Sequence, residues 1–198
     1  MLHNLKSTNI QVAMKEICTR LSMLFISVSP AYSCDGIHNA SEQVRTTVID
    51  TSTIRWLDVF SYMGKWYEIA RYDNRFERGL SHVTATYSLN EDGSIKIINE
   101  GFRDGKRYKA VGKGKYPEPT LYPGRLQVSF FLWFYSDYYI LELDEQAYSY
   151  AVVGSRSDKY LWILYREPVI PQSLLTDILE RLKKRGYDTS KLLFVNQA

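Results

Sequence analysis

The side chains best suited to covalent or metal chemistry, cysteine and histidine, are few in this chain. The two cysteines are Cys18 and Cys34, and the three histidines are His3, His38 and His82. Only His82 falls in the region whose pattern predicts a fold. We therefore expect no cysteine nucleophile, no thiolate metal site and no histidine zinc site.

Other residue patterns that support catalysis are also missing from the sequence. It has no Ser–His–Asp set, no pair of carboxylates in a recognisable context and no glycine-rich phosphate loop. One acid, Glu68, lies inside a predicted strand. A single buried carboxyl suits a hydrogen bond to tyrosine or to a ligand better than it suits catalysis. The expectation is a binding protein and not an enzyme, with no cofactor and no metal.

The charge balance argues against a nucleic-acid partner. The formal net charge is +3, and Lys6, Lys15 and Arg20 against Glu16 place +2 of it in the first 33 residues. The remaining chain carries only +1, which leaves no basic excess to hold a phosphate backbone.

The N-terminal segment has the pattern of an export signal, which we assign to residues 1–33. Arg20 precedes an apolar run over residues 21–29, too short for the roughly 20 residues that span a bilayer. Small residues before Cys34 resemble a bacterial lipobox, so we expect Cys34 to be lipidated and residues 34–57 to form a flexible tether. The alternative is plain secretory cleavage, which would give a soluble secreted or periplasmic protein.

Further along, segments of strand-like pattern alternate with turns at roughly 10-residue spacing, which predicts a sandwich or barrel. Asp92-Gly93 and Asp104-Gly105 are strong hairpin signals. A helix follows Pro171 and ends near Gly186, and a short final strand covers residues 192–195. The predicted barrel strands cover residues 65–72, 81–89, 95–102, 107–115, 125–131, 138–143, 148–154 and 160–165.

Two motifs resemble those of the lipocalin family, specifically its bacterial and apolipoprotein D branch. Gly64-Lys65-Trp66-Tyr67-Glu68-Ile69-Ala70-Arg71 is similar to the family's first signature, and Leu161-Trp162-Ile163-Leu164-Tyr165-Arg166 to its third. The resemblance covers about residues 58–197. It implies an all-β fold over residues 58–198: an eight-stranded up-and-down antiparallel β-barrel with one C-terminal α-helix and a short final strand.

The same resemblance implies that Arg166 packs on Trp66 at the barrel floor as a cation–π pair. If both point inward, strand alternation predicts that every second residue from each faces the barrel interior. With a loop tyrosine near the mouth, the expected ligand-binding residues are Glu68, Ala70, Tyr72, Tyr135, Tyr160, Trp162 and Leu164.

The function that the resemblance implies is binding, storage or transport of a fatty acid, phospholipid or lysophospholipid at the bacterial outer membrane, with the protein held there by its lipid anchor. The alternative is a lipid isomerase or hydrolase on the same barrel. The loop over residues 132–137 departs from the bacterial pattern. The aromatic run over residues 130–135 would be an apolar patch for a membrane or a partner if exposed, and part of the core if folded inward; a homodimer contact there is left open.

Overall fold

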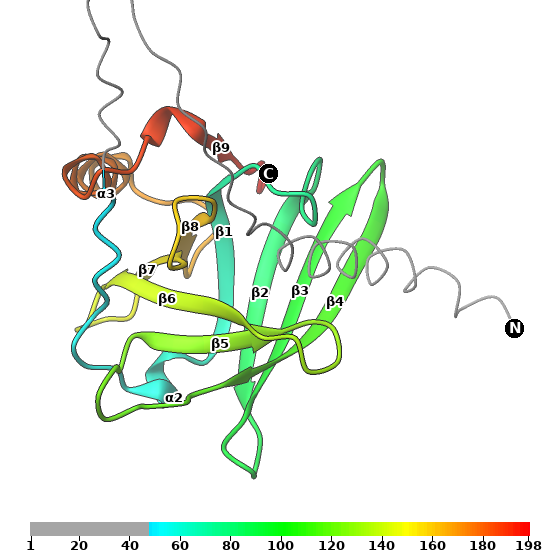
Figure 1. Ribbon diagram of the computed structural model, residues 1–198. Helices are drawn as coiled ribbons and strands as arrows, with labels where there is room; N and C mark the ends of the chain where they lie inside the picture. Colours follow the sequence, from blue (N-terminus) through cyan, green and yellow to red (C-terminus); the bar gives the residue numbers. More distant parts are fainter. Residues whose placement is uncertain (1–47) are drawn as a thin grey trace, which may run out of the picture.

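The computed structural model describes residues 48–198, which form a barrel with a long helix on its outer surface (Figure 1). A short helix, α2 (Val59–Tyr62), leads into the strands. After the barrel come α3 (Gln172–Lys184), a 3₁₀ turn η1 (Thr189–Lys191) and β9 (Leu192–Phe194). The barrel strands are β1 (Gly64–Tyr72), β2 (Ser81–Leu89), β3 (Ile95–Arg103), β4 (Lys106–Lys115), β5 (Arg125–Ser129), β6 (Ser136–Leu143), β7 (Tyr150–Gly154) and β8 (Leu161–Tyr165).

Each barrel strand pairs antiparallel with the next, and β1 pairs with both β2 and β8, so the sheet closes on itself. The strand β9 adds to β1 from outside, with Ala70 opposite Phe194. Between β3 and β4 only Asp104 and Gly105 turn the chain, both with positive φ, as a two-residue hairpin requires. The predicted all-β fold is confirmed: an eight-stranded antiparallel barrel, one C-terminal helix and a short final strand.

The segment before β1 forms one turn of α-helix, capped by the Asp58 side chain. Local details differ from the expectation at the ends of strands. The strand β5 ends at Ser129, because the Ser129 hydroxyl donates to the carbonyls of Phe131 and Leu132 and Leu132 adopts a φ of 50°. Tyr160 precedes β8 instead of opening it.

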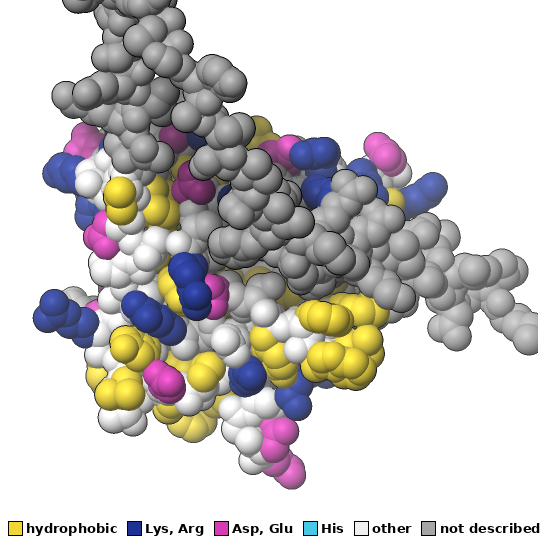
Figure 2. All heavy atoms as spheres, in the orientation of Figure 1, with side chains coloured by type: hydrophobic (Ala, Val, Ile, Leu, Met, Phe, Trp, Pro, Cys, Tyr) yellow, Lys and Arg dark blue, Asp and Glu magenta, His cyan; other side chains and the backbone are white. Residues whose placement is uncertain are grey.

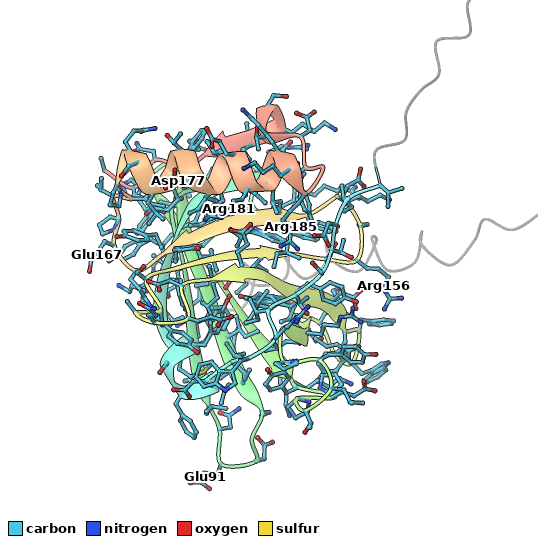
Figure 3. All side chains as sticks on the ribbon, turned by 90° about the vertical axis from the view of Figure 1, so that its left-hand side faces the viewer. Glu91, Arg156, Glu167, Asp177, Arg181 and Arg185 are labelled. Atoms are coloured by element: carbon cyan, nitrogen blue, oxygen red, sulfur yellow. The ribbon has the colours of Figure 1, made fainter. Side chains whose placement is uncertain are left out.

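The helix α3 lies across the outer face of the barrel, and its arginines bind elements beneath it (Figure 3). Arg181 donates to Glu142 of β6 at 2.8 Å. Arg185 donates to the backbone of Asp50 and Ser52. Ile54 is buried and its amide bonds to Ile140. Residues 50–54 are therefore packed on the barrel, which corrects the expected tether for this stretch; Cys34 and residues 1–33 lie outside the described residues.

Two apolar clusters sit on opposite sides of the barrel wall. The inner cluster contains Trp66, Ile97, Ile140 and Leu164 among others. The outer cluster joins strand residues such as Ile163 to the buried face of α3. The inner cluster fills one end of the barrel, so open space is confined to the other.

Candidate functional site

The barrel encloses a cavity of about 660 Å³. That volume falls within the range of about 300–1,000 Å³ that is typical of small-molecule sites. The loops joining β1 to β2, β5 to β6 and β7 to β8 all contribute to its wall, so it opens at the barrel end that carries these loops. Its apolar lining comes from Phe76, Leu80, Val83, Ala110, Val128, Phe130, Phe131, Phe134 and Trp162.

One wall of the cavity is an aromatic stack. The rings of Tyr160 and Trp162 lie parallel, with an interplanar angle of 2° and centroids 5.7 Å apart. Phe76, from the β1–β2 loop, continues the stack on Tyr160 at 6.5 Å. Flat aromatic faces offer a large contact area with few rotatable bonds, so this wall suits an extended hydrocarbon chain.

The same wall carries one carboxylate, that of Glu77, which hydrogen bonds hold in place. Its Oε2 accepts from the indole N–H of Trp162 at 3.0 Å and from the side-chain amide of Asn74 at 2.6 Å. On β3, Asn99 also lines the cavity, and its buried Oδ1 has no hydrogen-bond partner within residues 48–198. The cavity therefore presents acceptor oxygens to a ligand as well as apolar surface.

Beside this wall, Glu68 and Arg71 form a buried ion pair with Nη1–Oε1 at 2.5 Å. Arg71 also donates to the backbone carbonyls of Glu77 and Leu80, which ties the β1–β2 loop to the strand. Burial, and then the nearby charge of Glu77, raise the pKa of Glu68 well above its ordinary value, and Arg71 opposes this only in part. The Arg71 guanidinium thus binds one carboxyl group, that of Glu68, together with the backbone of the β1–β2 loop.

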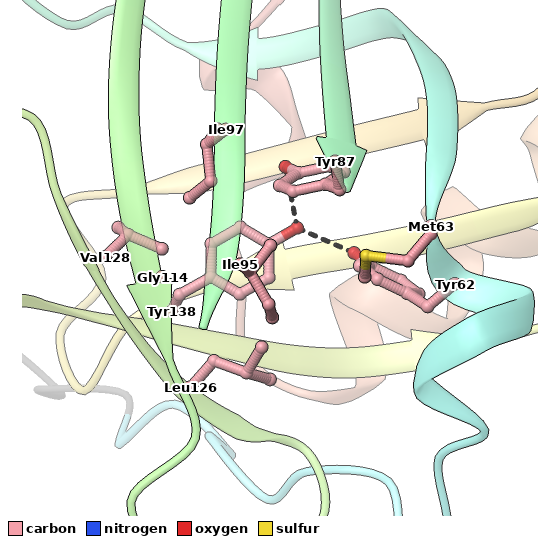
Figure 4. Close-up of a pocket in the computed structure, with 9 residues that line it drawn as sticks. All are labelled: Tyr62, Met63, Tyr87, Ile95, Ile97, Gly114, Leu126, Val128 and Tyr138. Carbon is pink, nitrogen blue, oxygen red and sulfur yellow. Dashed lines mark hydrogen bonds between the residues drawn. The ribbon is translucent and has the colours of Figure 1, made fainter. Parts of the chain in front are cut away.

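The floor of the cavity is made by Tyr138, whose hydroxyl contacts those of two further tyrosines. The Tyr138 hydroxyl lies 2.6 Å from that of Tyr62 and 3.0 Å from that of Tyr87 (Figure 4). Below them is a space of only about 10 Å³, and Tyr138 and Val128 line both this space and the large cavity. Burial raises the pKa of all three tyrosines. Their hydroxyls therefore stay protonated, and the hydrogen bonds between them are preserved.

Beneath the tyrosines the barrel end is plugged. The Arg166 guanidinium lies 3.7 Å from the centroid of the Trp66 ring, which is completely buried. Arg166 donates to the carbonyls of Lys65, Ser61 and Tyr148, joining both ends of the barrel sequence. The structure thus brings Trp66 and Arg166 together, but the tyrosine layer separates them from the cavity.

The predicted ligand residues fall into three groups. Tyr135, Tyr160 and Trp162 line the cavity. Glu68 and Leu164 are buried on the inner side of the wall but do not line it. The other two, Ala70 and Tyr72, belong to the outer cluster under α3.

The inward orientation expected for Ala70 and Tyr72 is wrong, and a β-bulge is the reason. Glu68 faces Leu164 and Ala70 faces Ile163, so Ile69 is an extra residue in β1. A bulge reverses the alternation beyond it, since one residue is left unpaired. Arg71 therefore takes the inner side, and the Tyr72 hydroxyl donates to the backbone of Asp188 outside the barrel.

Sequence reasoning missed several residues of the site, above all Glu77, Asn99 and Tyr138. Tyr138 opens a predicted strand, and its alternation with the buried Ile140 would have placed it inside. Glu77 and Phe76 lie in a loop whose path follows from contacts with Arg71 and Trp162, which no local pattern encodes.

No described helix has both the length and the apolar character that crossing a bilayer requires.

Comparison with known proteins agrees with this architecture. Residues 57–197 match the family model of the lipocalin-like domain. The chain is 44% identical over 139 residues to outer membrane lipoprotein Blc of Vibrio cholerae, covering 69% of this chain and 81% of that protein. It is 34% identical over 150 residues to apolipoprotein D of Bos taurus, covering 71% and 77%.

Among solved structures, insecticyanin from the tobacco hornworm superposes with a TM-score of 0.61 at 19% identity, covering 75% of this chain and 85% of the other. Lobster apocrustacyanin A1 gives a TM-score of 0.58 at 25% identity, covering 71% and 80%. The barrel, its C-terminal helix and the paired Trp66 and Arg166 agree with the sequence match, and the chain belongs to the lipocalin family.

Proposed function

We propose that this lipocalin binds and carries a single-chain amphiphilic lipid, a fatty acid or a lysophospholipid, in the cavity above Tyr138. The observation that carries the proposal is the aromatic-lined space of about 660 Å³. Each methylene group removed from water there would contribute about 0.8 kcal/mol to binding. An eight-stranded barrel holds one small ligand, so a second acyl chain would compete for the same space.

The lining suggests how such a lipid is oriented. The acyl tail points toward Tyr138, along the stack of Tyr160 and Trp162. The headgroup stays near the mouth, where Lys109 and Arg156 contribute cations to the wall. Both of these cations already lie near carboxylates, Lys109 near Glu100 at 3.6 Å and Arg156 near Asp137 at 3.3 Å, so the mouth offers charge of both signs to a zwitterionic or anionic headgroup.

The location we propose is the bacterial outer membrane, with a lipid anchor on Cys34. Support comes from the relative in Vibrio cholerae, which is named an outer membrane lipoprotein. Cys34 and the preceding residues lie outside the described residues, so the proposal for the anchor rests on the sequence pattern. Binding is favoured over catalysis because the carboxylate on the aromatic wall of the cavity, that of Glu77, already accepts from Asn74 and Trp162, and no nucleophile–base pair lines the cavity among the described residues.

The test is native mass spectrometry of the protein isolated from its own host, followed by extraction of any lipid that accompanies it. We expect one single-chain lipid per barrel. A preparation that carries only two-chain phospholipid would contradict the proposed ligand class. Conversion of a labelled lipid by the purified protein would instead support the alternative of a lipid-modifying enzyme.

A further inference from the structure

We propose that the tip of the β5–β6 loop and the outer row of β4 form one docking face for an anionic lipid bilayer. The loop tip consists of Leu132, Trp133 and Phe134. The outer row of β4 consists of the exposed residues Arg107, Val111, Lys113 and Lys115. This contact is separate from the proposed lipid anchor at Cys34 and does not depend on what the cavity binds.

The loop tip exposes large apolar side chains to solvent. Leu132 is 62% exposed and Trp133 is 74% exposed, and Phe134 is 46% exposed. Figure 2 shows hydrophobic side chains gathered over this loop. The three side chains are adjacent in sequence, and the rings of Trp133 and Phe134 stack with centroids 6.4 Å apart. A cluster of this kind on a protein surface marks an interaction site, whereas single exposed apolar residues do not.

The loop is held in this shape by its own backbone and by the packing of Phe134 on Phe131. Phe131 and Phe134 stack at 6.3 Å, and both line the cavity. Leu132 has a φ of 50°, an unusual conformation for a bulky residue, which turns the chain so that Leu132 and Trp133 face outward. The exposure of Trp133 is thus built into the loop.

The neighbouring strand supplies positive charge. From Lys106 to Lys115, β4 carries five basic residues and no acidic one, and all five are exposed. Carboxylates from other elements offset only part of this charge: Arg107 and Lys109 share Glu100, and Lys113 lies 3.8 Å from Asp92. A net positive excess remains on this side of the barrel.

The two features are adjacent. Lys115 Nζ lies 4.2 Å from the centroid of the Tyr135 ring, at the end of the loop. Lys113 pairs with Ser129, the last residue before the loop. Aromatic residues insert at the headgroup level of a bilayer, and basic residues are attracted by anionic lipids, so the combination fits a lipid surface better than it fits a neutral protein partner.

The proposed docking face lies beside the mouth of the cavity. Because Phe131, Phe134 and Tyr135 belong to the same loop and line the cavity, docking would place the cavity mouth at the membrane surface. A lipid entering or leaving the barrel would then cross less water than it would from a mouth exposed to solvent.

The experiment is vesicle flotation with the full chain carrying Cys34→Ser, so that no acyl group at residue 34 contributes. Vesicles contain phosphatidylcholine and phosphatidylglycerol in equal amounts, or phosphatidylcholine alone. We expect stronger binding to the anionic vesicles and about a tenfold loss of that binding for Trp133→Ser. The double variant Lys113→Gln/Lys115→Gln should lose about tenfold on anionic vesicles and little on neutral ones.

The chain offers matched controls for both changes. Trp56 is 55% exposed beside α2, at the closed end, and Lys183 and Lys184 are exposed on α3. Trp56→Ser and Lys183→Gln/Lys184→Gln should bind like the parent chain. Equal losses in the controls, or no binding by the parent chain, would overturn the proposal. So would a change from dimer to monomer in Trp133→Ser with vesicle binding unchanged, because the loop would then be a contact between copies.

Discussion

The hydroxyl of Tyr138 lies 2.6 Å from the hydroxyl of Tyr62, and this contact divides the barrel interior. Above it is the cavity of about 660 Å³, and below it are a space of about 10 Å³ and the buried Trp66. The depth available to a ligand is therefore set by a tyrosine layer and not by the end of the barrel. Trp66 and Arg166, which the family resemblance places at the barrel floor, lie beyond this layer.

Tyr138→Ala should lengthen the acyl chain that the barrel accepts, because removing the ring joins the cavity to the space below it. Affinity should keep rising with chain length beyond the point where the wild type reaches a plateau, by about 0.8 kcal/mol for each further methylene. Calorimetric titration with saturated fatty acids of increasing length measures this. Tyr138→Phe keeps the ring and serves as the control, with the plateau at the wild-type length. An unchanged plateau in Tyr138→Ala would show that the floor lies elsewhere.

Trp66→Ala should cost about 3–5 kcal/mol of unfolding free energy, as truncation of a fully buried aromatic side chain. Arg166→Ala should cost less, about 2 kcal/mol, because its guanidinium is partly exposed. The two losses should be coupled by at least about 0.5 kcal/mol, since the groups touch. Urea denaturation of the four proteins of the double-mutant cycle gives the coupling, and strictly additive losses would contradict a stabilising contact.

Glu68 should make the stability of the barrel depend on pH. Its pKa is raised above the ordinary value of 4.5 by burial and by Glu77, so the folded state holds this proton more tightly than the unfolded state. The stabilisation is complete below the unfolded pKa and is lost as pH rises through the folded pKa. Glu68→Gln should remove this loss.

Denaturation of wild type and Glu68→Gln from about pH 4 to about pH 9 tests the direction of this pH dependence of stability. The free energy of unfolding of the wild type should fall relative to that of Glu68→Gln as pH increases. A difference that grows in the opposite direction would mean that Arg71, and not burial, controls the carboxyl.

Cys34→Ser should prevent labelling of the protein by a clickable fatty acid in its own host. The variant should also be released from membranes by a high-salt wash, which weakens the electrostatic contact proposed for the β4 face. Retention of an unlabelled Cys34→Ser protein after that wash would contradict the proposed anchor.

The fold was predictable because its signals are local. Aspartate–glycine pairs set two hairpins, alternation marked the strands, and the octet beginning at Gly64 resembled a known family. The strand order followed from these signals, and Pro171 and Gly186 marked the ends of the helix. Trp66 and Arg166 lie at opposite ends of the barrel sequence, so no local signal predicts their contact. Only the family resemblance predicted it.

The site was less predictable because one residue changes its geometry. Ile69 is an extra residue within the pairing of β1 with β8, so the alternation that is correct at Trp66 and Glu68 fails at Ala70 and Tyr72. Such a bulge depends on pairing with two other strands, and the sequence of β1 alone does not show it. The same holds for Glu77, whose place on the cavity wall depends on Arg71.

The central claim, that a single acyl chain occupies the space above Tyr138 beside Trp162, is tested most directly by affinity as a function of chain length. Dissociation constants of fatty acids of increasing length are measured for wild type and for Trp162→Ala, with circular dichroism as the folding control. We predict that wild-type affinity rises about fourfold per methylene up to a plateau, and that Trp162→Ala binds more weakly at every length. Affinity that does not change with chain length, or equal affinity in the folded Trp162→Ala protein, would contradict the claim.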